Sequence, residues 1–343
     1  MRVAGRTLVA GWFSFPDTGA TAGDLMAMQV VCSWLEGAHI AYDVALAPRY
    51  GDGVEWGSAD PQRYSHVVFV CGPFYRSDLL RRFEGSRLVG VDLSMVDPIE
   101  EWNPFDLLLE RDSSQASRPD LAIAAPARRV PVVGLCMLPP DTAKVATDGY
   151  VAAEEAVRRL VERHDVAPVV IDTELSGGAM DLRSPAAVDS LVARADVIVS
   201  TRLHGLVLGL RNGVPVLAID PVPGGERVRR QAEALGWSPV LGPDEMDDAS
   251  LDRAFERCLS PDARDRAAAS ANEARDAVAE IGSTLVAAIA DDDGSPGWGD
   301  GRRRGGWTLP EVATSSLQPA PGRLGGGARA VRAVRRRLGR GSR

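Results

Sequence analysis

The stretch DVIVSTRLHGLVLGLRNGVPVLAID, residues 196–220, decides the fold. It opens with a β-branched run at 197–199, continues with apolar residues at helical spacing (Leu203, Leu206 and Leu210), and closes with a second apolar run at 214–219. Continuous apolar runs separated by one amphipathic helix are typical of strands that are buried on both faces of a parallel sheet. The stretch therefore predicts a strand–helix–strand unit.

Comparable units recur along both halves of the chain. The runs that predict strands are 6–13, 66–74, 87–94, 130–138, 167–173, 196–201 and 214–220. The stretches that predict helices are 25–35, 153–161, 189–195, 203–213 and 226–237, with a short charged helix between 74 and 87. We therefore predict an α/β protein made of two doubly wound Rossmann-like domains, residues 1–129 and 130–290, that face a cleft.

The last segment, residues 291–343, differs in composition. It is rich in Gly, Pro and Ser and contains 11 Arg against 5 acidic residues, a charge of +6, whereas the preceding 28 basic and 42 acidic residues sum to −14. We expect a disordered tail, whose RAVRRRL stretch is suited to forming a short helix on an anionic partner such as a membrane surface. A solvated tail without a specific partner is the alternative. The acidic body argues against nucleic-acid binding.

The composition also bears on metal sites and location. The four cysteines (Cys32, Cys71, Cys136 and Cys258) and the four histidines are dispersed, with no CxxC pair, which predicts reduced thiols and no protein-built metal site. No apolar run approaches the roughly 18 residues that cross a bilayer. The first residues are interpreted as a strand and not as an export signal, so we expect a cytoplasmic protein, with membrane association through the tail left open.

Polar residues stand where the strand of the opening stretch ends and its helix begins. Ser200 and Thr201 supply hydroxyls that could cap the helix. A helix N-terminus offers unpaired N–H groups and a partial positive charge at the edge of the sheet where ligands bind. Arg202 adds a fork for phosphate or carboxylate, His204 adds a proton-transfer group, and Gly205 leaves room beside them. The stretch predicts a receptor for a small anion.

A second helix start follows the next strand. Gly224 and Gly225 would let the backbone approach a ligand, and a helix begins near Glu226. We expect these two helix starts to converge on one pocket. Spacing alone leaves a plainer alternative open, in which the arginine is a surface residue and the histidine is a satisfied cap or core contact.

STRLHG at 200–205, with the strand and the ALGW segment that follow, resembles the signature region of the polysaccharide pyruvyltransferase family. The glycine turn that ends at Gly23 and Asp24, the strand at 67–72 and ERDSS at 110–114 are similar to further family segments. The resemblance implies a two-domain fold like that of the GT-B glycosyltransferases. It also implies transfer of pyruvate from phosphoenolpyruvate onto two hydroxyls of a sugar or glycan as a ketal, with release of phosphate and without a cofactor.

The resemblance further implies roles for individual residues. It makes Arg202, His204 and Arg111 donor-binding residues. With the residues of the two helix starts, the donor-binding residues that we expect are Ser200, Thr201, Arg202, His204, Gly205, Arg111, Gly224 and Gly225. His204 would be the acid that protonates the methylene carbon of phosphoenolpyruvate. The N-terminal domain would hold the acceptor through Asp17, Gly23 and Asp24, and Asp17 or Asp24 would accept the proton of the attacking hydroxyl.

Two other functions stay open at this stage. A nucleotide-sugar glycosyltransferase of the same shape is one, although residues 196–213 contain no Glu to hold a donor ribose and sugar. A non-catalytic sugar-binding or scaffold protein is the other, and the intact Arg202 and His204 argue against it. The sequence indicates neither the acceptor sugar nor the oligomeric state.

Overall fold

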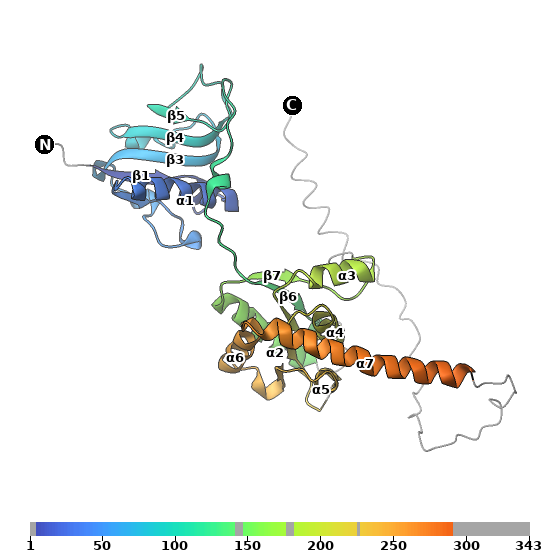
Figure 1. Cartoon of the computed structure of the whole chain (residues 1–343). Coiled ribbons are helices and arrows are strands. Elements are labelled where there is room, and N and C mark those ends of the chain that lie inside the picture. The colour runs from blue at the N-terminus through green and yellow to red at the C-terminus, as the bar shows by residue number, and fades with distance from the viewer. Residues whose placement is uncertain (1–4, 141–146, 176–181, 225–226, 291–343) are drawn as a thin grey trace, which may run out of the picture. The chain divides into compact units, whose positions relative to one another are not determined.

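The computed structural model describes residues 5–140, 147–175, 182–224 and 227–290 (Figure 1). Within these ranges the strands form two parallel sheets of five strands each. The chain divides into two compact units, Met1–Ala268, which holds both sheets, and Ala269–Arg343. The predicted α/β class, with two sheets of parallel strands, is confirmed.

The first sheet has the strand order β2-β1-β3-β4-β5. Its strands are β1 (Arg6–Ala10), β2 (Tyr42–Val44), β3 (Tyr64–Phe74), β4 (Arg87–Met95) and β5 (Leu107–Leu109). β2 pairs with one edge of β1 and β3 pairs with the other, so the strand order reverses between β1 and β3. In an open parallel sheet, the carboxyl ends of the strands at such a switch point form the crevice where ligands bind.

Both faces of the first sheet are covered. On one face α1 (Ala22–Gly37) packs Ala27 and Val31 against Val68 and Val91. The other face holds a core with many aromatic side chains, among them Trp56, Phe69, Phe74, Phe83 and Phe105. The predicted helix between β3 and β4 is wrong, because this connection contains only a 3₁₀ turn, Arg81–Phe83. Leu80 and Phe83 are three positions apart, so a single 3₁₀ turn is enough to bury both side chains.

The second sheet has the strand order β10-β9-β8-β6-β7. Its strands are β6 (Val132–Cys136), β7 (Ala167–Val170), β8 (Val197–Ser200), β9 (Val216–Ile219) and β10 (Val240–Leu241). β7 pairs with one edge of β6 and β8 pairs with the other. The switch point of this sheet therefore lies between β6 and β8.

Helices cover both faces of the second sheet. The elements are α3 (Pro185–Val192), α4 (Leu203–Arg211) and α5 (Arg227–Ala234) on one face and α2 (Thr147–Arg163) and α6 (Asp248–Leu259) on the other. Ile198 joins the core on the α4 side, whereas Val197 and Val199 join the core on the α2 side. β8 is buried throughout, which confirms the strand–helix–strand unit predicted from the opening stretch.

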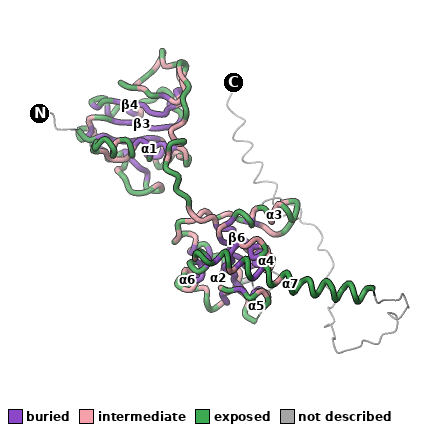
Figure 2. The backbone as a smooth tube through the Cα atoms, viewed as in Figure 1, coloured by how far each residue is buried: buried purple, intermediate pink, exposed green. Residues whose placement is uncertain are grey.

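The last described helix is α7 (Ala263–Ala290). Ala263, Ala267 and Ala271 are buried, whereas every residue after Glu273 except Ala274 lies on the exposed part of the helix (Figure 2). None of the helices in the described ranges is long and apolar enough to cross a membrane. The predicted tail, residues 291–343, lies outside the described residues.

Candidate functional site

Arg202 lies at the switch point of the second sheet, between β8 and α4. Its Nε donates to the carbonyl oxygen of Met137 (3.1 Å), the first residue after β6. Its Nη2 lies 3.4 Å from Oδ1 of Asp172, beyond the end of β7, and both side chains are 15% exposed. The guanidinium thus spans the carboxyl ends of three strands. Asp172 offsets part of its charge and holds it in place.

Ser200 and Thr201 do not cap α4, in contrast to the expectation from sequence. Ser200 Oγ accepts from the Arg202 backbone N–H (3.0 Å), and Thr201 Oγ1 accepts from the Leu138 N–H (2.8 Å). Both residues are buried and bind the end of β8 to neighbouring backbone. The N-cap residue of α4 is Arg202 itself, which makes no side-chain capping bond. The first N–H groups of α4 therefore have no side-chain cap and keep their capacity to bind an anion.

His204 stands in the first turn of α4 and is exposed. It lines a pocket of about 590 Å³ together with Thr173, Leu175 and residues of α3. Arg202 contacts Asp172, the neighbour of Thr173, so both site residues border the segment that follows β7. Arg202 is not among the described residues that line this pocket, so a shared site of the arginine and the histidine stays a prediction.

Gly205 has a packing role that differs from the expected one. A Cβ on this residue would lie 2.1 Å from Ser200 Oγ and 2.7 Å from Cys136 Cβ. Glycine is therefore required for α4 to approach β6 and β8, and not to leave room for a ligand. The same burial raises the pKa of the Cys136 thiol to about 12, although Arg202 lowers it.

The second expected helix start is already occupied by a carboxylate. Asp220 is buried, and its Oδ2 accepts from the backbone N–H groups of Val228 (3.0 Å) and Arg229 (3.1 Å) at the start of α5. Two of the first N–H groups of α5 therefore already have an acceptor, and the convergence of the two helix starts on one pocket stays a prediction. Gly224 has a left-handed backbone (φ 67°), and Gly225 lies outside the described residues.

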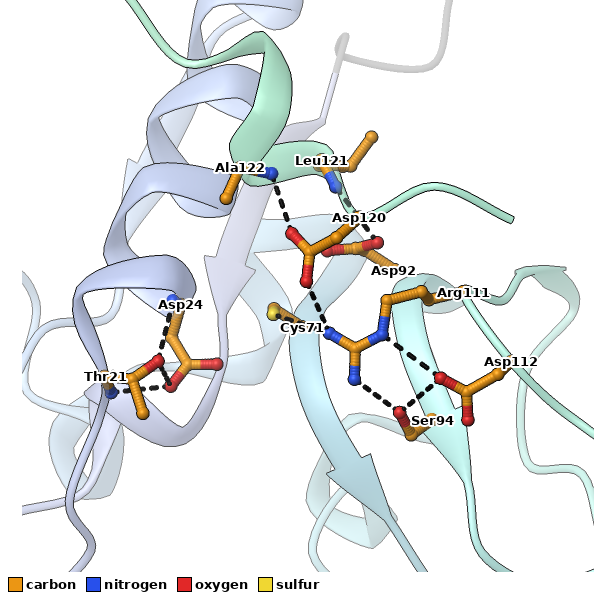
Figure 3. Close-up of polar contacts among 10 residues, drawn as sticks. All are labelled: Thr21, Asp24, Cys71, Asp92, Ser94, Arg111, Asp112, Asp120, Leu121 and Ala122. Atoms are coloured by element: carbon orange, nitrogen blue, oxygen red, sulfur yellow. Dashed lines mark hydrogen bonds and ion pairs between the residues drawn. The ribbon is translucent and has the colours of Figure 1, made fainter. Parts of the chain in front are cut away.

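Arg111 belongs to a polar cluster beside the first sheet (Figure 3). Its Nη1 lies 2.7 Å from Asp120 Oδ2, its Nε lies 3.2 Å from Asp112 Oδ2, and its Nη2 donates to Ser94 Oγ. Burial alone would lower the pKa of Arg111, but the hydrogen bonds with Asp112 and Asp120 raise it above its ordinary value. The guanidinium is fixed by two carboxylates and a hydroxyl.

Cys71 and Asp92 lie at the back of the same cluster and were not predicted as site residues. They are buried, lie on neighbouring strands β3 and β4, and both have left-handed backbones (φ 61° and 59°). Asp92 Oδ1 accepts from the Leu121 N–H (3.2 Å), whereas Oδ2 has no hydrogen-bond partner among the described residues. Burial, and then the charge of Asp120, raise the pKa of Asp92. A single sequence carries no signal for such a pairing across strands.

The fold also forms a group with metal-ligand chemistry, although the dispersed cysteines and histidines predicted none. Donor atoms of Cys71, Asp92 and Asp120 lie within 4.8 Å of one another. Arg111 Nη1 is 3.8 Å from Cys71 Sγ and 2.7 Å from Asp120 Oδ2. The arginine guanidinium therefore already supplies a positive charge at this cluster.

The expected acceptor residues lie at and before the start of α1. Asp24 Oδ2 accepts from both the backbone N–H (2.7 Å) and the hydroxyl (2.9 Å) of Thr21, which closes the capping box (Figure 3). Its other oxygen is turned toward Cys71, whose pKa is raised by burial first and then by Asp24. Gly23 is part of the same helix turn, and Asp17 is exposed in the preceding loop.

Comparison with protein families gives one finding for this site. Residues 107–221 match the model of the polysaccharide pyruvyl transferase family, so the expected resemblance is confirmed over this range. The matched range includes Arg111, Arg202 and His204. No curated protein matches the chain.

Comparison with solved structures finds glycosyltransferases at low similarity. CalG4, the calicheamicin glycosyltransferase, has 12% identity over 85% of this chain and 99% of that chain, with a TM-score of 0.32. SnogD from Streptomyces nogalater has 15% identity over 82% of this chain and 99% of that chain, with a TM-score of 0.28. At these TM-scores the backbones superpose poorly over the whole chain.

Proposed function

We propose, from the match of residues 107–221 to the polysaccharide pyruvyl transferase family, that this chain transfers pyruvate from phosphoenolpyruvate to a sugar or glycan. The product is a ketal that bridges two hydroxyls, and phosphate is released. The observation that carries the proposal is the uncapped start of α4, with Arg202 and His204 beside it at a switch point. A dense anion with a carboxylate and a phosphate suits this combination of charge and hydrogen-bond donors.

The reaction assigns a task to each residue. Arg202 binds one anionic group of phosphoenolpyruvate, and the uncapped N–H groups of α4 bind another. Protonated His204 gives its proton to the methylene carbon, which makes the adjacent carbon electrophilic. One sugar hydroxyl adds to that carbon, and the second replaces phosphate as the carbon–oxygen bond to phosphate breaks. One of the two hydroxyl protons restores the proton that His204 gave to the methyl group, and the other leaves with phosphate.

Further residues complete the proposed assignment. Arg111 is retained as a third donor residue, and Asp24 as the base for the attacking hydroxyl, acting through the oxygen that does not serve the capping box. Asp17 and Gly23 border the acceptor. Because Asp172 already offsets part of the charge on Arg202, the α4 N–H groups are needed beside the arginine to hold the donor.

Thermal shift and product analysis test the proposal. Phosphoenolpyruvate should raise the melting temperature, because a ligand that binds only the folded state stabilises it, whereas UDP- and GDP-sugars should not. Incubation with phosphoenolpyruvate and a panel of sugars should yield phosphate and a product heavier by one pyruvate ketal. Stabilisation by nucleotide sugars alone would favour glycosyl transfer instead.

Two substitutions separate binding from proton transfer. Arg202→Ala should weaken phosphoenolpyruvate binding by roughly ten- to a hundredfold, the size of a lost charge-assisted hydrogen bond. His204→Ala should lower kcat by on the order of a hundredfold or more and change donor binding less. Calorimetric titration and steady-state rates measure these effects, with Arg128→Ala, a surface residue paired with Asp165, as the control. Equal losses of binding without a separate loss of rate would make His204 a recognition residue only.

A further inference from the structure

Two aromatic side chains lie at the switch point of the first sheet. Trp12 follows the end of β1 by two residues, and Tyr75 directly follows β3. Because β1 and β3 are the strands between which the order reverses, these side chains occupy the part of the sheet edge where ligands bind in open α/β folds. Neither side chain belongs to the proposed anion-binding site.

The two rings form one rigid surface. Their centroids are 5.9 Å apart with an angle of 20° between the planes, an offset stack. Trp12 Nε1 donates to the carbonyl oxygen of Pro73 (2.8 Å), and the indole packs edge-on against the buried Phe69. Tyr75 is 50% exposed. The indole is therefore held from behind, while the phenol ring presents an open face.

Gly72 sets the position of this surface. It has a left-handed backbone (φ 85°), and a Cβ on it would lie 2.4 Å from Trp12 Cδ1 and 3.7 Å from Asp24 Oδ1. The indole and the carboxylate thus meet above the same glycine. On the Tyr75 side, Asp97 Oδ2 accepts from the Arg76 N–H (2.8 Å). One carboxylate therefore lies near Trp12, and another contacts the backbone of the residue that follows Tyr75.

We infer that Trp12 and Tyr75 form a stacking platform for a pyranose ring of the acceptor. A pyranose has an apolar face of C–H groups that stacks on an aromatic ring, and a rim of hydroxyls that donate to carboxylates. The start of α1 is closed by its own capping box, and the carboxylates of Asp24, near Trp12, and Asp97, at the residue after Tyr75, disfavour a phosphate. The platform is therefore suited to a neutral sugar and not to a nucleotide. The binding of a sugar to the platform is independent of the proposed function, but the role of that sugar as the acceptor rests on it.

Saturation-transfer NMR without phosphoenolpyruvate tests the platform. The probes are the α- and β-methyl glycosides of glucose, galactose and mannose, titrated into the full chain. We expect transfer to the ring C–H protons of at least one glycoside, and a Kd about five- to tenfold higher for Tyr75→Ala, the range measured for aromatic contacts. Tyr75→Phe should keep the wild-type Kd. Trp34→Ala, which removes an exposed indole from α1, is the matched control and should also leave it unchanged.

The outcomes separate this inference from the proposed function. Absence of saturation transfer with all six glycosides, or an unchanged Kd in Tyr75→Ala, overturns the platform whether or not pyruvate is transferred. A raised Kd in folded Tyr75→Ala, with an unchanged melting temperature, supports it even if the chain transfers no pyruvate. Where transfer occurs, Tyr75→Ala should raise the KM for the sugar and leave the KM for phosphoenolpyruvate at its wild-type value.

Discussion

Asp92 is a carboxylate whose surroundings do not favour its charge. Its side chain is buried, one oxygen has no hydrogen-bond partner among the described residues, and Asp120 lies nearby. Burial disfavours the ionised form, and the neighbouring negative charge adds to this. Asp112, which bonds to Ser94 and Arg111, is the opposite case, because these contacts lower its pKa. One arginine thus serves a cluster in which the carboxylates experience different environments.

Asp92→Asn should stabilise the protein at neutral pH. A folded-state pKa above the unfolded value contributes stability that is present at low pH and is lost as pH rises through the folded-state pKa. The gain from the substitution should therefore be small near pH 4 and reach on the order of 1 kcal/mol at pH 7 to 8. Urea unfolding across this pH range measures it. Asp112→Asn is the control. It should lower the free energy of unfolding at neutral pH, and this loss should become smaller toward acid pH.

The starts of three helices that follow strands differ in how their N–H groups are satisfied. α1 is closed by Thr21 and Asp24, and α5 is closed by Asp220, a residue at the end of the preceding strand. At α4, no side chain in the described part of the chain caps the helix start. Because N-caps stabilise helices, the uncapped start of α4 beside Arg202 makes the protein less stable than a capped start would. This contrast is one reason why we propose α4 as the helix that binds the anion.

Removing the cap of α5 should destabilise the second sheet and leave the α4 site intact. Asp220→Ala should lower the free energy of unfolding by about 1 to 2 kcal/mol, because a buried and a half-buried N–H group lose their acceptor. Asp220→Asn keeps an acceptor oxygen and should lose less. Urea unfolding measures both variants, and phosphoenolpyruvate titration of the folded variants provides the control. An Asp220→Ala variant as stable as wild type would contradict the assigned cap.

Each of the two sheets has its own core, its own switch point and its own candidate residues there. In the first sheet these are aromatic rings and carboxylates, and in the second they are an arginine, a histidine and an uncapped helix start. Both sheets hold an arginine paired with carboxylates, Arg111 with Asp112 and Asp120 in the first and Arg202 with Asp172 in the second. The stacked aromatic rings suit the first group to a sugar, and the helix start suits the second to an anion. The buried part of α7 ends at Ala271, and the residues beyond it add little to either core.

Truncation tests how much of the chain the folded body requires. Deletion of residues 291–343 should change the melting temperature by no more than about 1 to 2 °C and preserve the response to phosphoenolpyruvate, because the end of α7 is already exposed. Deletion from residue 263 removes the buried Ala263, Ala267 and Ala271 and should lower it by several degrees. A large loss from the shorter deletion would mean that the tail packs on the body.

Apolar runs and helical spacing in the sequence determined the class of fold, most of the longer elements and the position of Arg202 and His204 at a strand end. These features are local, because burial on both faces of a strand leaves its mark in consecutive residues. The short strands β2, β5 and β10, of two or three residues, leave no such mark and were not predicted, and the helices α6 and α7 were not predicted either. The same holds for the Arg111 cluster, the pairing of Arg202 with Asp172, and the stacking of Trp12 on Tyr75. Those contacts join residues from separate strands, and only the register and order of the strands decide which side chains meet.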